Sequence, residues 1–360
     1  MTGLPMVVAD SGLPARVTIY EVGPRDGLQN EKTIVSTAVK VEFINRLIAA
    51  GLPIVEATSF VHPAWVPQLA DAAEVMRMLG GLDELDQRVS TGSTSGGLDE
   101  LDQRVSTGST NGGLDELDQR VSTGSTSGGL DQRKLRVLVP NARGLDRALE
   151  AGCKHIAIFA SATQTFAQKN LNSTLDDQYA MFEPVASRAL AAGVDVRAYL
   201  SMCFGDPWEG AVPAAQVVTA GKRLLDMGAS QLSIGDTIGV ATAAQVSALI
   251  DAFAAAGVGT DRLAMHFHDT YGQALANAYA ALQKGITTFD ASAGGLGGCP
   301  YAKSATGNLA TEDLVWMLTG LGIEHGVDLD ALVATSVWMA GHLGRPSPSA
   351  VVRALGSPTP

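Results

Sequence analysis

The stretch Arg262-Leu-Ala-Met-His-Phe-His268 combines the pattern of a short apolar strand with two histidines that lie two positions apart. Successive side chains of a strand point to opposite faces, so His266 and His268 share one face. The large apolar residues of the stretch share the other face, where they can pack on helices. This arrangement fits a barrel strand with imidazoles inside and apolar side chains outside.

Seven similar apolar segments alternate with helical patterns along the rest of the chain. The other predicted strands are Val17–Val22, Ile54–Ser59, Leu135–Val139, His155–Ala160, Asp195–Ser201, Gln231–Gly235 and Thr287–Ser292. The predicted helices are Ser36–Ala50, Pro67–Leu79, Ala142–Ala151, Leu175–Ala192, Ala214–Met227, Ala243–Ala256, Gln273–Lys284 and Leu309–Leu321. Eight strands, each followed by a helix, predict an α/β fold, a closed (β/α)8 TIM barrel, with two further helices after residue 328. A doubly wound open sheet is the alternative, but no G-x-G-x-x-G follows the first strand.

Residues 80–133 interrupt this alternation with tandem repeats. Three near-identical units of sixteen residues begin Gly80-Gly-Leu-Asp-Glu-Leu-Asp-Gln-Arg-Val-Ser-Thr-Gly-Ser-Thr-Ser95, and a truncated fourth follows. Few apolar residues and Ser/Thr/Gly-rich joints predict a flexible, loosely helical insert and not a stacked solenoid. The alternative is an interaction module. The insert lies between the second helix and the third strand of a single catalytic domain spanning 1–360, on the face opposite the catalytic one.

Composition limits the partners of the chain. A net charge of −12 argues against nucleic acid, and no apolar run is long enough to cross a bilayer. Three scattered cysteines favour a reducing compartment, and the first residues resemble neither a secretion signal nor a transit sequence. We therefore expect a cytoplasmic protein that acts on a small molecule, and we expect a homodimer.

A glycine-rich run, Gly294-Gly-Leu-Gly-Gly-Cys-Pro-Tyr301, carries Cys299 at its tip. Glycines provide a hinge and Pro300 fixes the adjacent turn, so the run favours a mobile thiol. It lacks the G-K-[ST] ending of a P-loop and does not indicate a nucleotide site. The alternative interpretation is a buried cysteine at the end of a barrel strand.

Charged residues lie near the carboxyl ends of the predicted strands, where the active sites of such barrels form. Arg25 and Asp26 lie in a glycine-bracketed turn after the first strand. A carboxylate in an apolar strand usually has a partner, and for Glu56 we expect Arg25. Asp236 is a further candidate, as is Glu312. Glu312, however, opens a helix, where a carboxylate favours the macrodipole without any catalytic role.

Histidines at i and i+2 on a strand are a cue for a metal site. His266 and His268, joined by a carboxylate and an amide such as that of Asn308, would make a mixed nitrogen and oxygen site. The alternative is a polar barrel interior held by hydrogen bonds.

Long motifs surround these positions. They are Gly23-Pro-Arg-Asp-Gly-Leu-Gln-Asn-Glu31, Ser59-Phe-Val61, Gly235-Asp-Thr-Ile-Gly239, His266-Phe-His-Asp-Thr-Tyr-Gly-Gln-Ala-Leu-Ala-Asn277, Gly295-Leu-Gly-Gly-Cys-Pro-Tyr301 and Gly307-Asn-Leu-Ala-Thr-Glu-Asp-Leu314. Together they closely resemble the 3-hydroxy-3-methylglutaryl-CoA lyase family over roughly residues 17–345 apart from the insert. That family belongs to a barrel superfamily of metal-dependent acyl-CoA lyases and synthases.

The resemblance implies an activity and a set of roles. It implies the cleavage of 3-hydroxy-3-methylglutaryl-CoA, an acyl-CoA substrate, to acetyl-CoA and acetoacetate, in leucine catabolism and ketone-body formation. The implied ligands of a divalent cation, Mg²⁺ or Mn²⁺, are Asp26, His266, His268 and Asn308. Arg25 would steady the thioester oxygen and Cys299 would be the thiol of the lid. The other implied active-site acids are Glu56, Asp236 and Glu312.

A mechanism follows as a hypothesis from these roles. Asp236, alone or with a histidine such as His266, would accept the proton of the tertiary hydroxyl, and Cys299 would protonate the acetyl-CoA carbanion. One departure from the family is Asp206, where many relatives have cysteine. Two rivals remain: a condensing synthase, which would lack a cysteine in the glycine run, and a non-catalytic scaffold whose repeats bind a partner.

Overall fold

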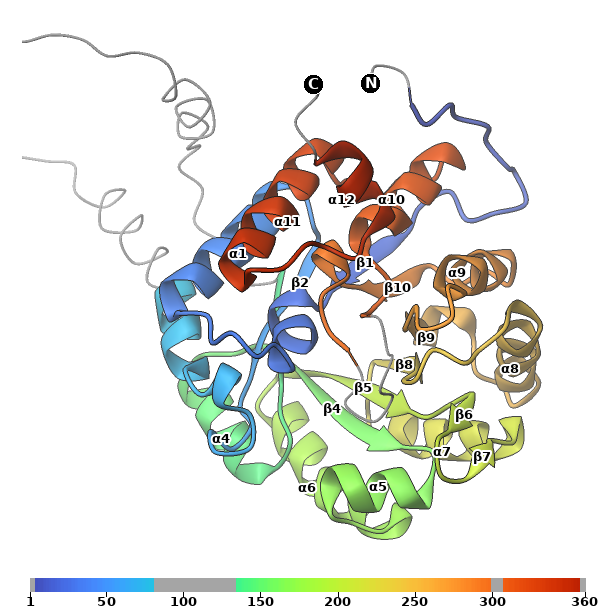
Figure 1. The fold of residues 1–360 in the computed structure, drawn as a ribbon. Coiled ribbons are helices and arrows are strands. Elements are labelled where there is room, and N and C mark those ends of the chain that lie inside the picture. The colour runs from blue at the N-terminus through green and yellow to red at the C-terminus, as the bar shows by residue number, and fades with distance from the viewer. Residues whose placement is uncertain (1–3, 81–133, 299–306, 357–360) are drawn as a thin grey trace, which may run out of the picture. The chain divides into compact units, whose positions relative to one another are not determined.

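The computed structural model describes residues 4–80, 134–298 and 307–356, and their centre is a closed barrel of parallel strands (Figure 1). The barrel strands are β1 (Thr18–Glu21), β2 (Ile54–Ser59), β3 (Leu135–Leu138), β4 (His155–Ser161), β5 (Asp195–Ser201), β8 (Gln231–Asp236), β9 (Leu263–Phe267) and β10 (Thr288–Ala291). Each strand pairs with the next along the chain, and β1 closes the barrel by pairing with β10. The predicted fold class and all eight predicted barrel strands are confirmed, with ends that differ by one residue at most.

Helices surround the barrel, as the alternation predicts (Figure 1). They are α1 (Thr37–Ala49), α4 (Ala142–Glu150), α6 (Leu175–Ala191), α7 (Ala214–Asp226), α8 (Ala243–Ala255), α9 (Ala274–Gln283), α10 (Thr311–Gly320), α11 (Leu329–Leu343) and α12 (Ala350–Leu355). The segment predicted as one helix over Pro67–Leu79 divides into a 3-10 turn, Pro67–Leu69, and a helix from residue 72 onward. None of the described helices is long and apolar enough to span a membrane.

The end of α1 shows how local sequence sets the return to a strand. Ser36 caps the helix start by accepting a hydrogen bond from the Val39 amide. After the helix, Gly51 has φ +95°, and a Cβ there would lie 2.2 Å from the carbonyl oxygen of Gly326. Only glycine fits this turn, because both the left-handed backbone and the close approach exclude a side chain.

Two elements near β5 escape prediction from the sequence pattern. They are the helix α5 (Gln164–Leu171) and a small hairpin of β6 (Gly205–Asp206) and β7 (Gly210–Ala211). Asp206, the residue that departs from the family pattern, organises this region. Its Oδ2 accepts a 2.6 Å hydrogen bond from the Thr163 hydroxyl, and its Oδ1 accepts bonds from the amides of Trp208 and Glu209. The aspartate therefore stabilises the turn of the hairpin and its contact with the end of β4.

The barrel interior is unusually polar. Arg197, Ser233 and Asp290 point inward from β5, β8 and β10, and all three are buried, with Arg197 and Ser233 both donating hydrogen bonds to Asp290. Barrels of this class more often fill that space with layers of branched aliphatic side chains. A buried charged network in their place indicates that the interior supports a polar site at the mouth of the barrel.

The predicted repeat insert over 80–133 lies outside the described residues from 81 on. Its entry point is described at both ends, since the chain leaves at residue 80 and returns at residue 134, just before β3 begins. The return is at the amino-terminal end of that strand. The site described next lies at the opposite, carboxyl-terminal ends of the strands. The single-domain assignment over 1–360 and the flexibility of the insert stay predictions.

Candidate active site

A single π-helical turn, Gly23–Gly27, presents Arg25 and Asp26 at the end of β1. The amides of Arg25, Asp26 and Gly27 all point to the carbonyl of Val22, which tightens the turn. Short π turns often mark functional sites. The turn directs the Arg25 guanidinium across the barrel mouth, where Nε lies 2.5 Å from Glu56 Oε2 and Nη1 donates a 2.6 Å hydrogen bond to Asp26 Oδ1. The expected pairing of Glu56 with Arg25 is therefore present.

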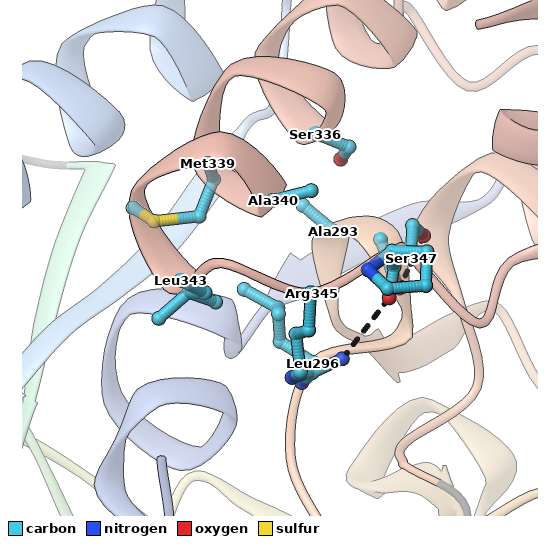
Figure 2. Close-up of a pocket in the computed structure, with 10 residues that line it drawn as sticks. Ala293, Leu296, Ser336, Met339, Ala340, Leu343, Arg345 and Ser347 are labelled. Carbon is cyan, nitrogen blue, oxygen red and sulfur yellow. Dashed lines mark hydrogen bonds between the residues drawn. The ribbon is translucent and has the colours of Figure 1, made fainter. Parts of the chain in front are cut away.

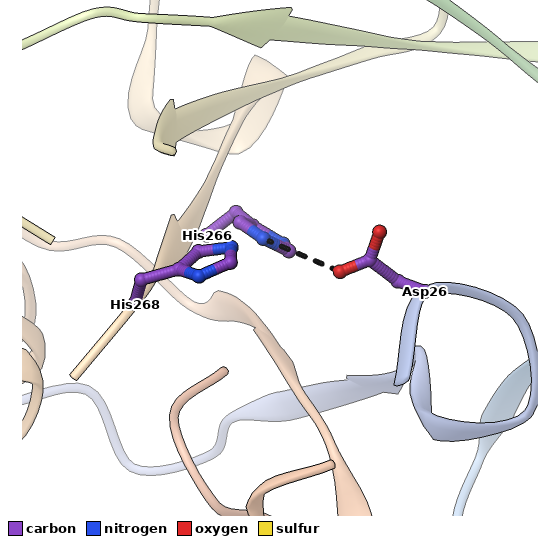
Figure 3. Close-up of side chains that lie close together, drawn as sticks. All are labelled: Asp26, His266 and His268. Atoms are coloured by element: carbon purple, nitrogen blue, oxygen red, sulfur yellow. Dashed lines mark ion pairs between the residues drawn. The ribbon is translucent and has the colours of Figure 1, made fainter. Parts of the chain in front are cut away.

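Asp26, His266 and His268 converge at this point (Figure 3). One ligand atom from each lies within 4.8 Å of the other two. His266 Nε2 is 4.0 Å from Asp26 Oδ2, and the two imidazole centroids are 5.3 Å apart. Both histidines are at most 9% exposed. Residues from the two ends of the sequence thus make one compact cluster of nitrogen and oxygen ligands.

Asn308 follows the glycine run, and its backbone forms an isolated antiparallel β-bridge with His268, which brings its side chain to the cluster. Its Nδ2 group donates to Asp26 Oδ2 at 2.9 Å and to the Leu296 carbonyl at 3.1 Å. Its Oδ1 is buried and has no hydrogen-bond partner among the described residues. A buried carbonyl oxygen without a partner costs free energy, and a cation bound by the cluster would satisfy it. The donor set therefore fits a divalent cation held by oxygen and imidazole ligands.

The surroundings of the cluster favour the protonation states in which its side chains can bind a cation. Burial and the neighbouring His266 lower the pKa of His268 to about 4, so its imidazole is neutral near pH 7. Burial by itself would raise the pKa of Asp26, but the charge of Arg25 and the two histidines lower it to about 2. A neutral imidazole and an ionised carboxylate are the forms that bind cations.

A cavity of about 700 Å³ opens over the cluster. It is lined by Arg25, Asp26, His266 and His268 in its polar part, and by Phe159, Tyr199 and Leu138 among others. Its volume lies within the range of cavities that bind small molecules and cofactors. Glu56, Asp236, Asn308 and Glu312 are not among its lining residues.

Asp236, predicted as the proton acceptor, supports the turn after β8. Its Oδ1 accepts a 2.9 Å hydrogen bond from the Val240 amide and its Oδ2 a 3.1 Å bond from the Ala241 amide. Burial raises its pKa to about 6 against the effect of these bonds. Its contacts in the structure are those of a residue that shapes the β8–α8 loop, and contact with the cavity is made by its neighbours Gly235 and Thr237.

Glu312 lies under the glycine run, apart from the cation cluster. Both of its carboxylate oxygens accept hydrogen bonds from the Gly294 amide, and the Ser336 hydroxyl donates to Oε1. Figure 2 shows the small pocket beside this contact, lined by Ser336 and Met339 of α11 and by Ser347. The acid therefore anchors the first residues of the run to α11.

Glu312 gives the protein a testable pH dependence. Burial raises its pKa to about 8, so the folded state keeps a proton that the unfolded chain releases near pH 4.5. The stability that this group contributes is complete below pH 4.5 and is lost as the pH rises toward 8. We expect Glu312→Gln to reduce the fall in unfolding free energy between pH 5.5 and 8.5 by roughly 1–3 kcal/mol, measured by urea titration. Exposed Glu150→Gln is the control, and an unchanged pH slope in Glu312→Gln would contradict the argument.

Three residues of the site are missed by the sequence analysis: Arg197, Tyr199 and Asp290. Tyr199 stacks between the guanidiniums of Arg25, 5.3 Å from its ring centroid, and Arg197, at 4.8 Å. Its hydroxyl is buried, without a partner among the described residues, while the side chain lines the cavity. The alternation rule that places both histidines inside also places all three of these residues inside.

Cys299 itself lies outside the described residues, so its role stays a prediction.

Comparisons with known proteins agree with this geometry. The profile of the HMGL-like family matches residues 124–338. The mitochondrial hydroxymethylglutaryl-CoA lyase of Arabidopsis thaliana is 46% identical over 96% of this chain, which spans 63% of that relative's length, and that of Rattus norvegicus is 42% identical over 95% of this chain and 90% of its own. The crystal structure of hydroxymethylglutaryl-CoA lyase from Pseudomonas aeruginosa superposes with a TM-score of 0.79 at 41% identity, covering 96% of this chain and 98% of its own. With its closed barrel and its convergent aspartate and histidines, the chain belongs to the hydroxymethylglutaryl-CoA lyase family.

Proposed function

We propose that this protein cleaves 3-hydroxy-3-methylglutaryl-CoA to acetyl-CoA and acetoacetate. The observation that carries the proposal is the convergence of Arg25, Asp26, His266 and His268 on one cavity in a member of this lyase family. The reaction needs a base for a tertiary hydroxyl and a cation for the enolate oxygen of the thioester. The cavity offers the cation in Arg25, and Asp236, between the lining residues Gly235 and Thr237, is the proposed base.

We propose Asp26, His266, His268 and Asn308 as the ligands of Mg²⁺ or Mn²⁺. Such an ion, when bound, acts as a Lewis acid that lowers the pKa of a hydroxyl it contacts. The chain's contribution is a rigid, buried donor set. Asn308 Nδ2 already holds Asp26 Oδ2 in place, which leaves the asparagine carbonyl free to act as a ligand.

Arg25 is the group suited to the enolate oxygen. Its guanidinium keeps its positive charge at any pH compatible with folding. Glu56 and Asp26 fix two of its nitrogens, and Tyr199 supports its face, so the guanidinium is oriented before substrate binds. Charge that is fixed in advance stabilises a developing oxyanion without reorganisation during the reaction.

The group that accepts the hydroxyl proton must reach the cavity. Asp236 does not line it, and both of its oxygens bind backbone amides. Asp26 and His266 do line it, but both are proposed cation ligands and the pKa of Asp26 is lowered to about 2. Asp236, whose pKa burial raises to about 6, therefore stays the proposed proton acceptor, and it must reach the hydroxyl in the substrate complex. The carbon–carbon bond then breaks, its electron pair passes to the thioester enolate, and Cys299 returns a proton to that carbon.

The rim of the cavity suits the rest of an acyl-CoA. Its exposed lining residues include Trp65, which is 74% exposed, Lys169 and Asn170. A lysine ammonium offers charge to phosphate groups, and an exposed indole offers a face for stacking. A role in leucine degradation follows from this substrate. Location in the cytoplasm stays a prediction, since both relatives named above are mitochondrial, and so does the homodimer.

A direct assay tests the proposed function. We expect the purified protein with Mg²⁺ to release acetoacetate from 3-hydroxy-3-methylglutaryl-CoA, measured by coupled oxidation of NADH. Removal of divalent cations by EDTA should reduce the rate by at least about 100-fold, and added Mg²⁺ or Mn²⁺ should restore it.

The same assay separates the rivals. Asp26→Ala, which loses one proposed ligand, serves as the inactive comparison, and the surface variant Arg188→Met serves as the active one. A condensing synthase would consume acetyl-CoA and make no acetoacetate. A protein loaded with cation that produces no acetoacetate would exclude the lyase function.

A further inference from the structure

Asp290 is the buried centre of a hydrogen-bonded network beneath the cation cluster. It is 1% exposed and lies at the middle of β10. The Arg197 guanidinium of β5 donates to both of its oxygens, at 2.6 Å to Oδ1 and 3.3 Å to Oδ2. The Ser233 hydroxyl of β8 donates to Oδ2 at 2.6 Å. Three strands therefore fix the position of one carboxylate.

That carboxylate faces the inner edge of His266. Asp290 Oδ2 lies 3.3 Å from His266 Nδ1, while Nε2 on the other edge of the ring faces Asp26. Nδ1 makes no hydrogen bond of standard geometry with any described residue, Asp290 included, so the 3.3 Å approach of Asp290 is a close contact between the two groups. An imidazole that binds a cation through Nε2 must carry its proton on Nδ1, and a buried N–H needs an acceptor. Asp290 is the acceptor that the fold supplies.

We propose that Asp290 is a positioning residue that holds His266 in the Nδ1–H tautomer, with Nε2 directed at the cation cluster. Arg197 and Ser233 hold Asp290 in turn. The proposal rests on the cation site of the proposed function. Asp290 does not line the cavity, so it acts only through His266.

A purely structural role for Asp290 is the competing explanation. Arg197 is buried between the rings of Tyr20, 4.0 Å from its guanidinium carbon, and Tyr199, and it needs a counter-charge. On that view the aspartate serves the arginine and not the histidine. The two views differ in what happens when the arginine and the aspartate are removed together.

The first experiment is Mn²⁺ binding to the full chain by electron paramagnetic resonance. We expect Asp290→Asn to weaken Mn²⁺ binding about 10–100-fold, the usual cost of losing an outer partner of a ligand histidine. Because Asp290→Asn leaves Arg197 without a counter-charge and can fail to fold, the double variant Arg197→Met/Asp290→Leu replaces the buried pair by apolar groups of similar size. We expect the double variant to fold and to show the same weak binding.

Three results would overturn the proposal. They are Mn²⁺ binding within threefold of wild type in a folded Asp290→Asn, recovery of such binding in the double variant, or a wild-type His266 that carries its proton on Nε2. The last is read from imidazole ¹⁵N shifts, with the His266 signals among six histidines assigned by the His266→Gln variant. A wild-type protein that binds no Mn²⁺ would instead overturn the cation site. The tautomer measurement on the wild-type protein is made without cation and at a pH high enough for His266 to be neutral, because Asp290 and Asp26 raise the pKa of this imidazole against the effect of burial. It tests Asp290 separately.

Discussion

Replacing Cys299 by serine is expected to lower kcat by about 10²–10⁴-fold while leaving Mn²⁺ binding unchanged. The thiol is the proposed donor of the proton that converts the acetyl-CoA carbanion into product. A serine hydroxyl has nearly the same size but is a far weaker acid, so it fits the same space and transfers the proton poorly. The measurement is kcat for acetoacetate release, with the cation dissociation constant measured on the same preparation.

The described residues just before Cys299 support the proposal that its thiol acts in this site. Gly298, the residue before it, lines the cavity, and its carbonyl accepts a 2.8 Å hydrogen bond from Asn30 Nδ2. Gly297 has φ +109°, and a Cβ there would lie 2.7 Å from Asn308 Nδ2. The run thus passes the cation cluster at Gly297 and Gly298, directly before Cys299. Buried Cys203→Ser is the matched control, and a Cys299→Ser enzyme with near-normal kcat would remove the thiol from the mechanism.

The sequence was sufficient for the barrel because each of its strands carries a strong local signal. Short apolar runs such as His155–Ser161 and Asp195–Ser201 alternate with helices that end at glycines, and this period leaves few other folds. The hairpin of β6 and β7 carries no such signal, since each of its strands has two residues. It depends instead on the bonds that Asp206 makes across the chain.

The site was predictable where family motifs mark it, and less so where tertiary contacts decide. Asp26, His266 and His268 do converge, as their motifs imply. Asp236 and Glu312 do not line the cavity. Their carboxylates instead accept hydrogen bonds from backbone amides, those of Ala241 and Gly294. The sequence does not indicate which backbone amide will donate a hydrogen bond to a given carboxylate. That information comes only from the packed loops.

The barrel interior holds a network of buried ion pairs that supports the proposed active site. Arg25 and Arg197 carry two buried positive charges on either side of the Tyr199 ring, and they form ion pairs with three carboxylates, those of Glu56, Asp26 and Asp290. Burial of so many charges is costly unless each has a partner. Arg25 is paired with Asp26 of its own turn and with Glu56 of β2, and Arg197 is paired with Asp290 of β10. Removing one member of the network therefore affects several others.

At the mouth of the barrel, Arg25→Met should reduce activity more than Arg25→Lys does. We expect kcat/KM to fall by about 10²–10³-fold or more, the range for losing one fixed donor to an oxyanion. The variant also leaves Glu56 and Asp26 without their counter-charge. Since the positive charge of Arg25 lowers the pKa of Asp26, its loss raises that pKa, and protons then compete with the cation at low pH.

Arg25→Lys separates charge from geometry. A lysine ammonium keeps the positive charge but is a compact point charge, so it cannot hold Glu56 and Asp26 with separate nitrogens as the guanidinium does. We expect Arg25→Met to bind Mn²⁺ more weakly at pH 5 than at pH 8, and we expect Arg25→Lys to keep Mn²⁺ binding at pH 5. Arg25→Lys should nevertheless recover little of the wild-type kcat. Arg188→Met, which breaks only an exposed pair with Asp146, is the control. If Arg25→Lys restored most of the wild-type kcat, charge alone would suffice, and the oriented guanidinium would not be what stabilises the enolate.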